Sequence, residues 1–159
     1  MIGLRPERPV RGNARRILRT RLDELYAFDR AVADPDATEE LHDMRIAAKR
    51  LRYLCEVFAP VFDGALDGFV DDLRDLQELL GDIHDCDVQL PLAERELAAA
   101  ALAGRRRARE RAGLRAWAAD LERRREARLS ALRTCWPALR ARWTAERFAE
   151  ALRGRRPSQ

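Results

Sequence analysis

The fold is decided by the stretch Leu41-His42-Asp43-Met44-Arg45-Ile46-Ala47-Ala48-Lys49-Arg50-Leu51-Arg52-Tyr53-Leu54. Two rows of residues recur in it at alternating steps of three and four, which is the spacing of one side of an α-helix. The first row is apolar and predicts a helix that faces a core; it consists of Leu41, Met44, Ala48, Leu51, Cys55 and Phe58. The second row is basic and consists of His42, Arg45, Lys49 and Arg52.

The basic row lies beside the apolar row, about 130° around the helix, and spans about 15 Å along its axis. Between Arg45 and Arg52 there is no acidic residue, although an ordinary exposed helix face mixes both charges. Because like charges at this spacing repel each other, we interpret the row as a binding surface for an extended anion. The alternative is that it is only the solvated face of an amphipathic helix.

A second segment follows, Leu76-Gln77-Glu78-Leu79-Leu80-Gly81-Asp82-Ile83-His84-Asp85-Cys86-Asp87-Val88. Together the two segments resemble the paired motifs of CHAD domains, over roughly residues 38–88. In that family the first helix carries a His, an Arg three residues on, a Lys/Arg-Arg pair and a further Arg, and the next helix ends in L-Q-x-x-L-G-x-x-x-D. The matching residues of the first helix are His42, Arg45, Lys49, Arg50 and Arg52.

The resemblance implies an all-helical, non-enzymatic module that binds inorganic polyphosphate through a basic helical groove and needs no cofactor. It adds Arg74 to the binding residues and Gln77 as a supporting residue. From the residues alone, Arg74 equally fits an ion pair with Glu78, four positions on. Asp85 is expected to orient one of the motif arginines, because a carboxylate fixes a guanidinium with two hydrogen bonds.

The arginines of the last helix have two interpretations as well. Arg124, Arg125 and Arg128 fall where the apolar spacing is interrupted between Leu121 and Leu129. Their stems would cover apolar surface while the charged ends reach water, or Arg124 and Arg125 would join the polyphosphate-binding residues.

Composition predicts one all-helical domain. The chain has 159 residues, of which 36% are charged and 47% apolar, with 8 glycines. It has no apolar run near the roughly 20 residues that cross a membrane, and no signal core at the N-terminus. We therefore expect a cytoplasmic protein without membrane contact, with polyphosphate granules as one location. Three scattered cysteines predict neither a disulfide framework nor a metal site.

Charge is distributed unevenly along the chain. Residues 63–100 hold eleven acids and two bases, whereas residues 101–159 hold seventeen bases and six acids. This asymmetry predicts two neighbouring helices of opposite charge that attract each other.

The expected fold is a four-helix bundle, one CHAD-like half, with a long final helix. The domain is expected over residues 10–152, between an extended lead-in at 1–9 and a basic tail at 153–159. Thr38 is expected to cap the motif helix, and Pro91 to end or kink the third helix. The expected helices run from about Val10 to Ala33, from Thr38 to Ala59, from Leu66 to Val88, over 92–103, and after a turn at 104–107, with Pro137 as a candidate kink.

The chain departs from the family in length. CHAD domains usually contain two similar halves, each with a basic motif helix, and only one such motif occurs here: the other histidine, His84, has Asp87 at the Arg position. We therefore expect a homodimer in which two chains complete the pocket, since symmetric dimers are the commonest oligomers. The alternative is a monomer with an open groove.

Three further alternatives remain. The spacing Glu39-x-x-His42 occurs in di-iron bundles, but a second such motif is not evident and Arg45 would repel a cation. A nucleic-acid-binding module could use the arginine-rich last helix, and a pure scaffold could use the arginines for dimerisation. A charged His42 would make anion affinity rise as pH falls through about 6.5, whereas a neutral His42 would serve as a hydrogen-bonding residue.

Overall fold

The computed structural model describes residue 7 and residues 9–102 and 107–153. Within these ranges every regular element is a helix, which confirms the all-α fold class. The predicted lead-in at 1–6 and 8, most of the turn at 103–106 and the tail at 154–159 lie outside the described residues. The elements are α1 (Val10–Tyr26), α2 (Asp29–Ala33), α3 (Thr38–Phe58), the short 3-10 helix η1 (Ala59–Val61), α4 (Asp67–Leu102), α5 (Ala108–Arg142) and α6 (Ala145–Arg153).

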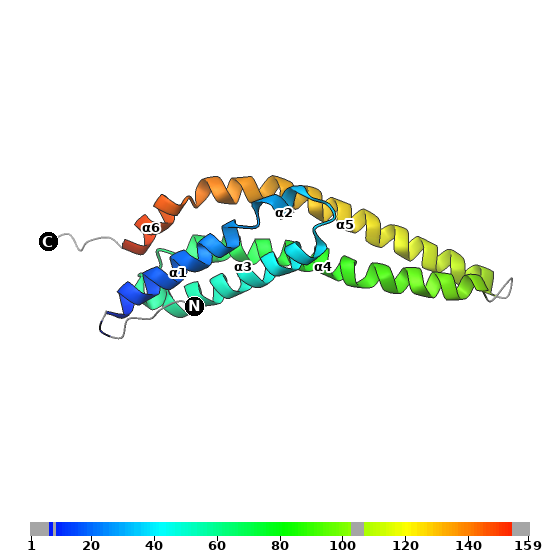
Figure 1. Ribbon diagram of the computed structural model, residues 1–159, viewed down its shortest axis with the longest axis horizontal. Helices are drawn as coiled ribbons and strands as arrows, with labels where there is room; N and C mark the ends of the chain where they lie inside the picture. Colours follow the sequence, from blue (N-terminus) through cyan, green and yellow to red (C-terminus); the bar gives the residue numbers. More distant parts are fainter. Residues whose placement is uncertain (1–6, 8, 103–106, 154–159) are drawn as a thin grey trace.

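The helices form an elongated bundle (Figure 1). In its body, α3 packs against α1 and α4, α4 packs against α5, and α6 packs against α1. Beyond the body only α4 and α5 continue, as a hairpin that extends to the right in Figure 1. The predicted bundle is thus present, with a two-helix extension. None of the described helices combines the length and apolar composition that a bilayer span requires.

The core lies in the body and follows the apolar row of the motif helix. Five members of that row are buried on α3, and Phe58 packs half-buried against them. The hairpin has a separate, smaller core of Cys86, Ala93, Ala118 and Leu121. Because the side of α3 next to this row stays at the surface, the basic row is held beside the core and not within it.

The first helix is shorter than predicted. It ends at Tyr26, and α2 begins at Asp29. Contacts with α5 and with the residue that follows it explain the break: the Tyr26 hydroxyl donates to the carbonyl of Trp143, and Trp136 Nε1 donates to Asp29 Oδ1 at 2.7 Å. The bonds made by these two side chains are long-range, and spacing along one helix cannot show them.

Two local predictions are wrong: an end of the third helix at Pro91 and a cap at Thr38. Pro91 does not end the third helix, because α4 runs through it to Leu102. A proline removes one backbone hydrogen bond, but Ala93 and Ala100 are fully buried on the continuing helix, and this packing keeps it intact. Thr38 is already inside α3, which begins without a side-chain cap, and its hydroxyl accepts a hydrogen bond from Arg125 Nη2 at 3.3 Å. Pro137, the candidate kink, lies inside α5.

The predicted attraction between an acidic and a basic helix is confirmed. Three ion pairs join α4 to α5 in the first part of α4: Asp72 with Arg142 at 2.5 Å, Asp82 with Arg128 at 2.9 Å, and Asp87 with Arg125 at 2.5 Å.

The first and last described helices are joined by hydrogen bonds. Arg15 Nε donates to the carbonyl of Leu152 at 2.8 Å, and its Nη2 donates to that of Arg153 at 3.1 Å. The last carbonyls of a helix lack partners within the helix, so α1 satisfies the end of α6.

Candidate anion-binding site

The two motif segments lie side by side on α3 and α4, which run antiparallel (Figure 1). At one end His42 Nδ1 and His84 Nδ1 are 3.3 Å apart, and the ring centroids are 4.7 Å apart. In such a pair one ring donates its N–H and the other accepts it. His84 was not among the predicted site residues, because a search for a repeat of His-x-x-Arg examines each helix separately and cannot detect a pair across two helices.

In the middle of the contact Arg45 lies against a position of α4 that has no side chain. A Cβ built on Gly81 would be 3.9 Å from Arg45 Nε. Arg45 is half-buried, and no hydrogen bond or ion pair joins it to another residue in the described ranges. The arginine therefore has a sheltered position and an uncompensated charge.

At the other end Arg52 bridges the two helices. Its Nε donates to Gln77 Oε1 at 3.2 Å, and its Nη1 donates to Glu56 Oε1 at 2.8 Å. Gln77 in turn donates from Nε2 to the carbonyl of Leu73 at 3.1 Å, which fixes the amide so that its oxygen faces the arginine. The guanidinium also lies 4.5 Å from the ring centroid of Tyr53, an exposed side chain.

Lys49 and Arg50 complete the cations of the motif. Both are exposed, and neither forms an ion pair with another described residue. Lys49 Nζ is 5.8 Å from the Tyr53 ring centroid. Lys49 continues the row, whereas Arg50 is turned about 100° further around the helix. We call the surface along the two helices the basic strip; it consists of His42, Arg45, Lys49, Arg52, Gln77, Gly81 and His84.

Arg74 lies beyond the Arg52 end of the basic strip. Of the two interpretations of Arg74, the ion pair with Glu78 is wrong: Arg74 Nη1 pairs with Asp71 Oδ1 at 2.7 Å, and Nη2 pairs with Glu56 Oε1 at 3.1 Å. Asp71 is one turn earlier on the same helix, and Glu56 faces Arg74 from α3. Arg74 therefore reaches the strip only through the carboxylate that it shares with Arg52.

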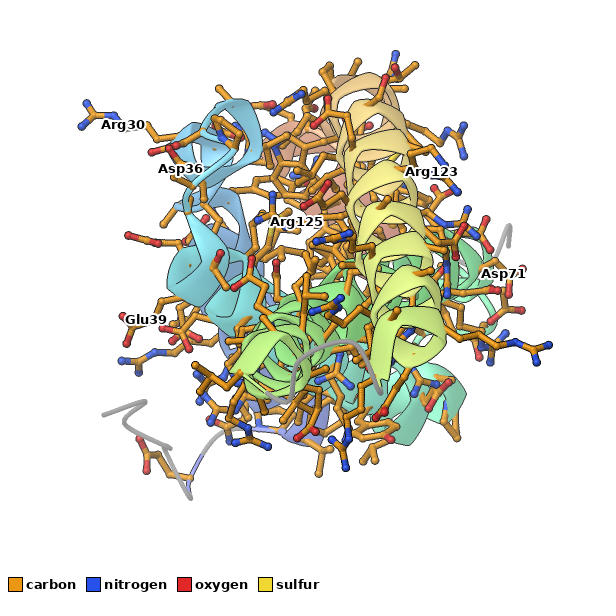
Figure 2. All side chains as sticks on the ribbon, turned by 90° about the vertical axis from the view of Figure 1, so that its right-hand side faces the viewer. Arg30, Asp36, Glu39, Asp71, Arg123 and Arg125 are labelled. Carbon is orange, nitrogen blue, oxygen red and sulfur yellow. The ribbon has the colours of Figure 1, made fainter. Side chains whose placement is uncertain are left out.

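The structure does not bring Arg125 into the basic strip. Its side chain is 18% exposed and pairs with Asp87, whose side chain is 9% exposed. Arg125 Nη2 also donates to the carbonyl of Pro35 at 3.0 Å. Figure 2 shows Arg125 pointing from α5 toward the segment that carries Asp36, whereas Arg123 points outward. These partners make Arg125 a link between α5, α4 and the start of α3.

Two other predicted residues also lie apart from the basic strip. Arg124 is exposed on α5 and has no ion pair within the described ranges. Asp85 is exposed and bonds to no motif arginine, so its predicted role is wrong. One residue along a helix is a turn of about 100°, which carries Asp85 away from the side where His84 meets α3. In the described part of the chain, no three His, Cys, Asp or Glu side chains gather in a way that could hold a metal ion.

Comparison with known families shows which family contains this pair of helices. The family model described as the CHAD domain matches residues 3–94, more than half of the chain. The chain belongs to the CHAD domain family. The matched segment of this CHAD domain member contains α1, α2, α3 and most of α4, and therefore the whole basic strip; α5 and α6 follow the match. No curated protein matches the chain, and no solved structure matches it.

Proposed function

We propose that this CHAD domain member binds inorganic polyphosphate along the basic strip, without catalysing a reaction. The observation that carries the proposal is the free charge in the middle of the strip: Arg45 and Lys49, with Arg50 beside them, form no ion pair within the described ranges. Cations held close together repel each other unless an anion lies against them. An anion with repeated charges would satisfy the whole row at once.

The chemistry of the side chains favours phosphate. A guanidinium keeps its charge and offers several N–H donors in a plane, so that it can bind two oxygens at once. Hydrogen bonds between charged partners are roughly twice as strong as neutral ones. Because Arg45 and Arg52 are half-buried, the local dielectric is lower than in water, and each contact is worth more than an exposed ion pair.

A second copy of the chain would complete the site. The family resemblance suggests two basic motif helices for each pocket, and this chain has one. The side of α4 that carries Gly81 and His84 continues onto the hairpin as Val88 and Leu92, both exposed apolar residues. An apolar surface next to the strip favours a symmetric dimer in which the two strips lie near each other. We further propose that the protein acts in the cytoplasm, where polyphosphate granules are one location.

A single-stranded nucleic acid is the second candidate ligand. Tyr53 is exposed beside Lys49 and Arg52, and single-strand-binding proteins combine cations with aromatic rings on which bases stack. One aromatic ring beside the row is a smaller stacking surface than such proteins use, so polyphosphate remains the preferred ligand.

Titration of the protein distinguishes the two ligands. Long-chain polyphosphate, triphosphate, single-stranded RNA and DNA are titrated at two salt concentrations. We expect the highest affinity for long polyphosphate, with a decrease at higher salt because counterions are released on binding. Preference for RNA or DNA would contradict the proposal, and a Tyr53→Ala variant with reduced affinity for RNA would identify the stacking mode.

A pair of matched double variants tests the site. Arg45→Ala with Arg52→Ala should abolish polyphosphate binding while helicity is retained. Arg123→Ala with Arg133→Ala removes the same charge from α5, where Arg123 is exposed and Arg133 half-buried, and should leave most of the binding. Equal effects of the two double variants would mean that the strip is only a solvated face. Light scattering, with and without polyphosphate, tests the dimer.

A further inference from the structure

The basic strip ends at a carboxylate that two arginines share. Glu56 Oε1 accepts a hydrogen bond from Arg52 Nη1 at 2.8 Å and one from Arg74 Nη2 at 3.1 Å. The two guanidiniums come from α3 and α4 and converge on a single oxygen. A phosphate oxygen bound between two arginines would need the same arrangement, so the carboxylate occupies the place that an anionic ligand would take.

The surroundings of Glu56 differ from the rest of the strip. A surface cavity of about 390 Å³ lies just beyond it and is lined by three carboxylates, Glu56, Asp67 and Asp71, together with Arg74. At Arg45 and Lys49, in contrast, no described carboxylate neutralises the cations. Positive charge is therefore uncompensated in the middle of the strip and compensated at the Glu56 end, where further carboxylates would repel a polyanion.

We propose that Glu56 is an internal competitor of the ligand, which holds Arg52 and Arg74 until a polyphosphate displaces it. This inference rests on the proposed function of the strip. An anion bound only at Arg45 and Lys49 leaves the carboxylate in place. An anion that reaches Arg52 lies beside the Glu56 carboxylate, and because the two negative charges repel each other, its binding weakens or replaces the Glu56 contacts. Glu56 thus lowers the affinity and favours chains with enough charge to displace it.

Glu56→Gln tests this role, with Asp82→Asn as the matched control. Both changes remove one negative charge, and the two carboxylate side chains are almost equally exposed, at 33% and 34%. Each carboxylate also pairs with an arginine of a neighbouring helix, Asp82 with Arg128 of α5. A general effect of net charge would therefore appear in both variants. Loss of the carboxylate that pairs with Arg52 would act in Glu56→Gln alone, where Arg74 keeps its ion pair with Asp71.

The variants are titrated with long-chain polyphosphate and with triphosphate. We expect Glu56→Gln to bind long polyphosphate about three- to ten-fold more tightly than the wild type, which corresponds to one partly sheltered charge-assisted contact. Asp82→Asn should change the affinity by less than about two-fold. Because Arg52 no longer has a carboxylate partner and contacts phosphate directly, the salt dependence of Glu56→Gln should become steeper by about one unit of log slope.

The outcomes separate the two proposals. If the wild type binds polyphosphate but Glu56→Gln binds equally tightly, or no more tightly than Asp82→Asn, the competitor role is wrong and the proposed function stands. If neither the wild type nor Glu56→Gln binds, both proposals are wrong. Circular dichroism and thermal unfolding check that the variants fold. Glu56→Ala, which also leaves Arg52 without a carboxylate partner, serves if the glutamine variant does not fold, and it should show the same tightening.

Discussion

The imidazole rings of His42 and His84 meet across α3 and α4, with 3.3 Å between their Nδ1 atoms. This contact joins the first residue of the basic row to the second motif segment. Together with the hydrogen bond from Arg52 to Gln77, it fixes how the two helices are aligned along their length. The alignment places Arg45 over Gly81 and keeps the cations in one line.

The histidine pair should show coupling in a double-mutant cycle. His42→Ala, His84→Ala and the double variant are compared by urea unfolding. Both rings are half-buried, and removal of one leaves a nitrogen of the other without its partner. We expect a coupling free energy of unfolding of about 0.5–1.5 kcal/mol, the usual worth of a hydrogen bond. Strictly additive effects would show that the rings do not interact in solution.

Two substitutions of Gly81 should separate stability from binding. Gly81→Ala should raise the free energy of unfolding by about 0.5–1 kcal/mol, because alanine favours a helix more than glycine does. Its Cβ makes only an ordinary contact with Arg45 Nε at 3.9 Å, so polyphosphate affinity should not change. Gly81→Leu should weaken binding, because the longer side chain occupies the surface on which Arg45 lies. Calorimetry measures the stability of the variants, and titration measures their affinity for polyphosphate. Equal affinity of both variants would contradict this placement of Arg45.

Substitution of Asp87 should destabilise the protein, although it leaves every residue of the basic strip in place. Asp87→Ala leaves the guanidinium of Arg125, which is only 18% exposed, without its carboxylate. We expect the free energy of unfolding to fall by about 1–3 kcal/mol. Asp120→Ala breaks a more exposed ion pair with Arg123, and its effect should be below about 1 kcal/mol. Urea unfolding compares the variants, and similar losses in both would mean that burial of the Arg125 pair adds nothing.

The buried thiol of Cys55 should reduce stability at alkaline pH. Burial raises the pKa of Cys55 from 9.0 to about 12, and the nearby charge of Glu56 adds to the shift. Above pH 9 the unfolded thiol ionises while the folded thiol does not. The contribution to stability is therefore complete below pH 9 and is lost as the pH rises from about 9 toward about 12.

Cys55→Ala tests this contribution. Urea midpoints are measured at about pH 8 and about pH 10.5, and the fall between the two should be smaller in Cys55→Ala than in the wild type. Cys135→Ala is the control, because that thiol is only half-buried and should leave the fall closer to that of the wild type. An unchanged fall in Cys55→Ala would show that ionisation of this thiol is not linked to unfolding.

Spacing within one helix could be predicted, and contacts between helices could not. The apolar row of α3 is buried as predicted because a repeat of 3.6 residues fixes which side of a helix faces the core. The opposite charges of α4 and α5 predicted that these helices are neighbours, but not which residues pair. The carboxylate that meets Arg125 is Asp87, two positions from Asp85, and that difference depends on the rotation of α4 about its axis.

Predictions from local sequence failed where contacts between helices outweigh the preferences of single residues. The break between Tyr26 and Asp29 follows from bonds to Trp143 and Trp136, more than 100 positions away. Pro91 should interrupt a helix by its own chemistry, yet the packing of Ala93 and Ala100 in the hairpin continues it. Glu56 is adjacent to Cys55 in the sequence and was not predicted as part of the site, since its role depends on Arg74 from another helix.

The hydrogen bonds from Arg15 to the end of α6 can form only late in the synthesis of this protein. Arg15 lies 137 positions before Leu152, so both hydrogen-bonding carbonyls are synthesised long after α1 has left the ribosome. Contacts between α3 and α4 join residues that are closer in the sequence, with 42 positions between His42 and His84. Pairs with a short sequence separation form sooner than pairs with a long one. During translation α3 and α4, which carry the basic strip, can therefore pair before α1 reaches its contacts with α6.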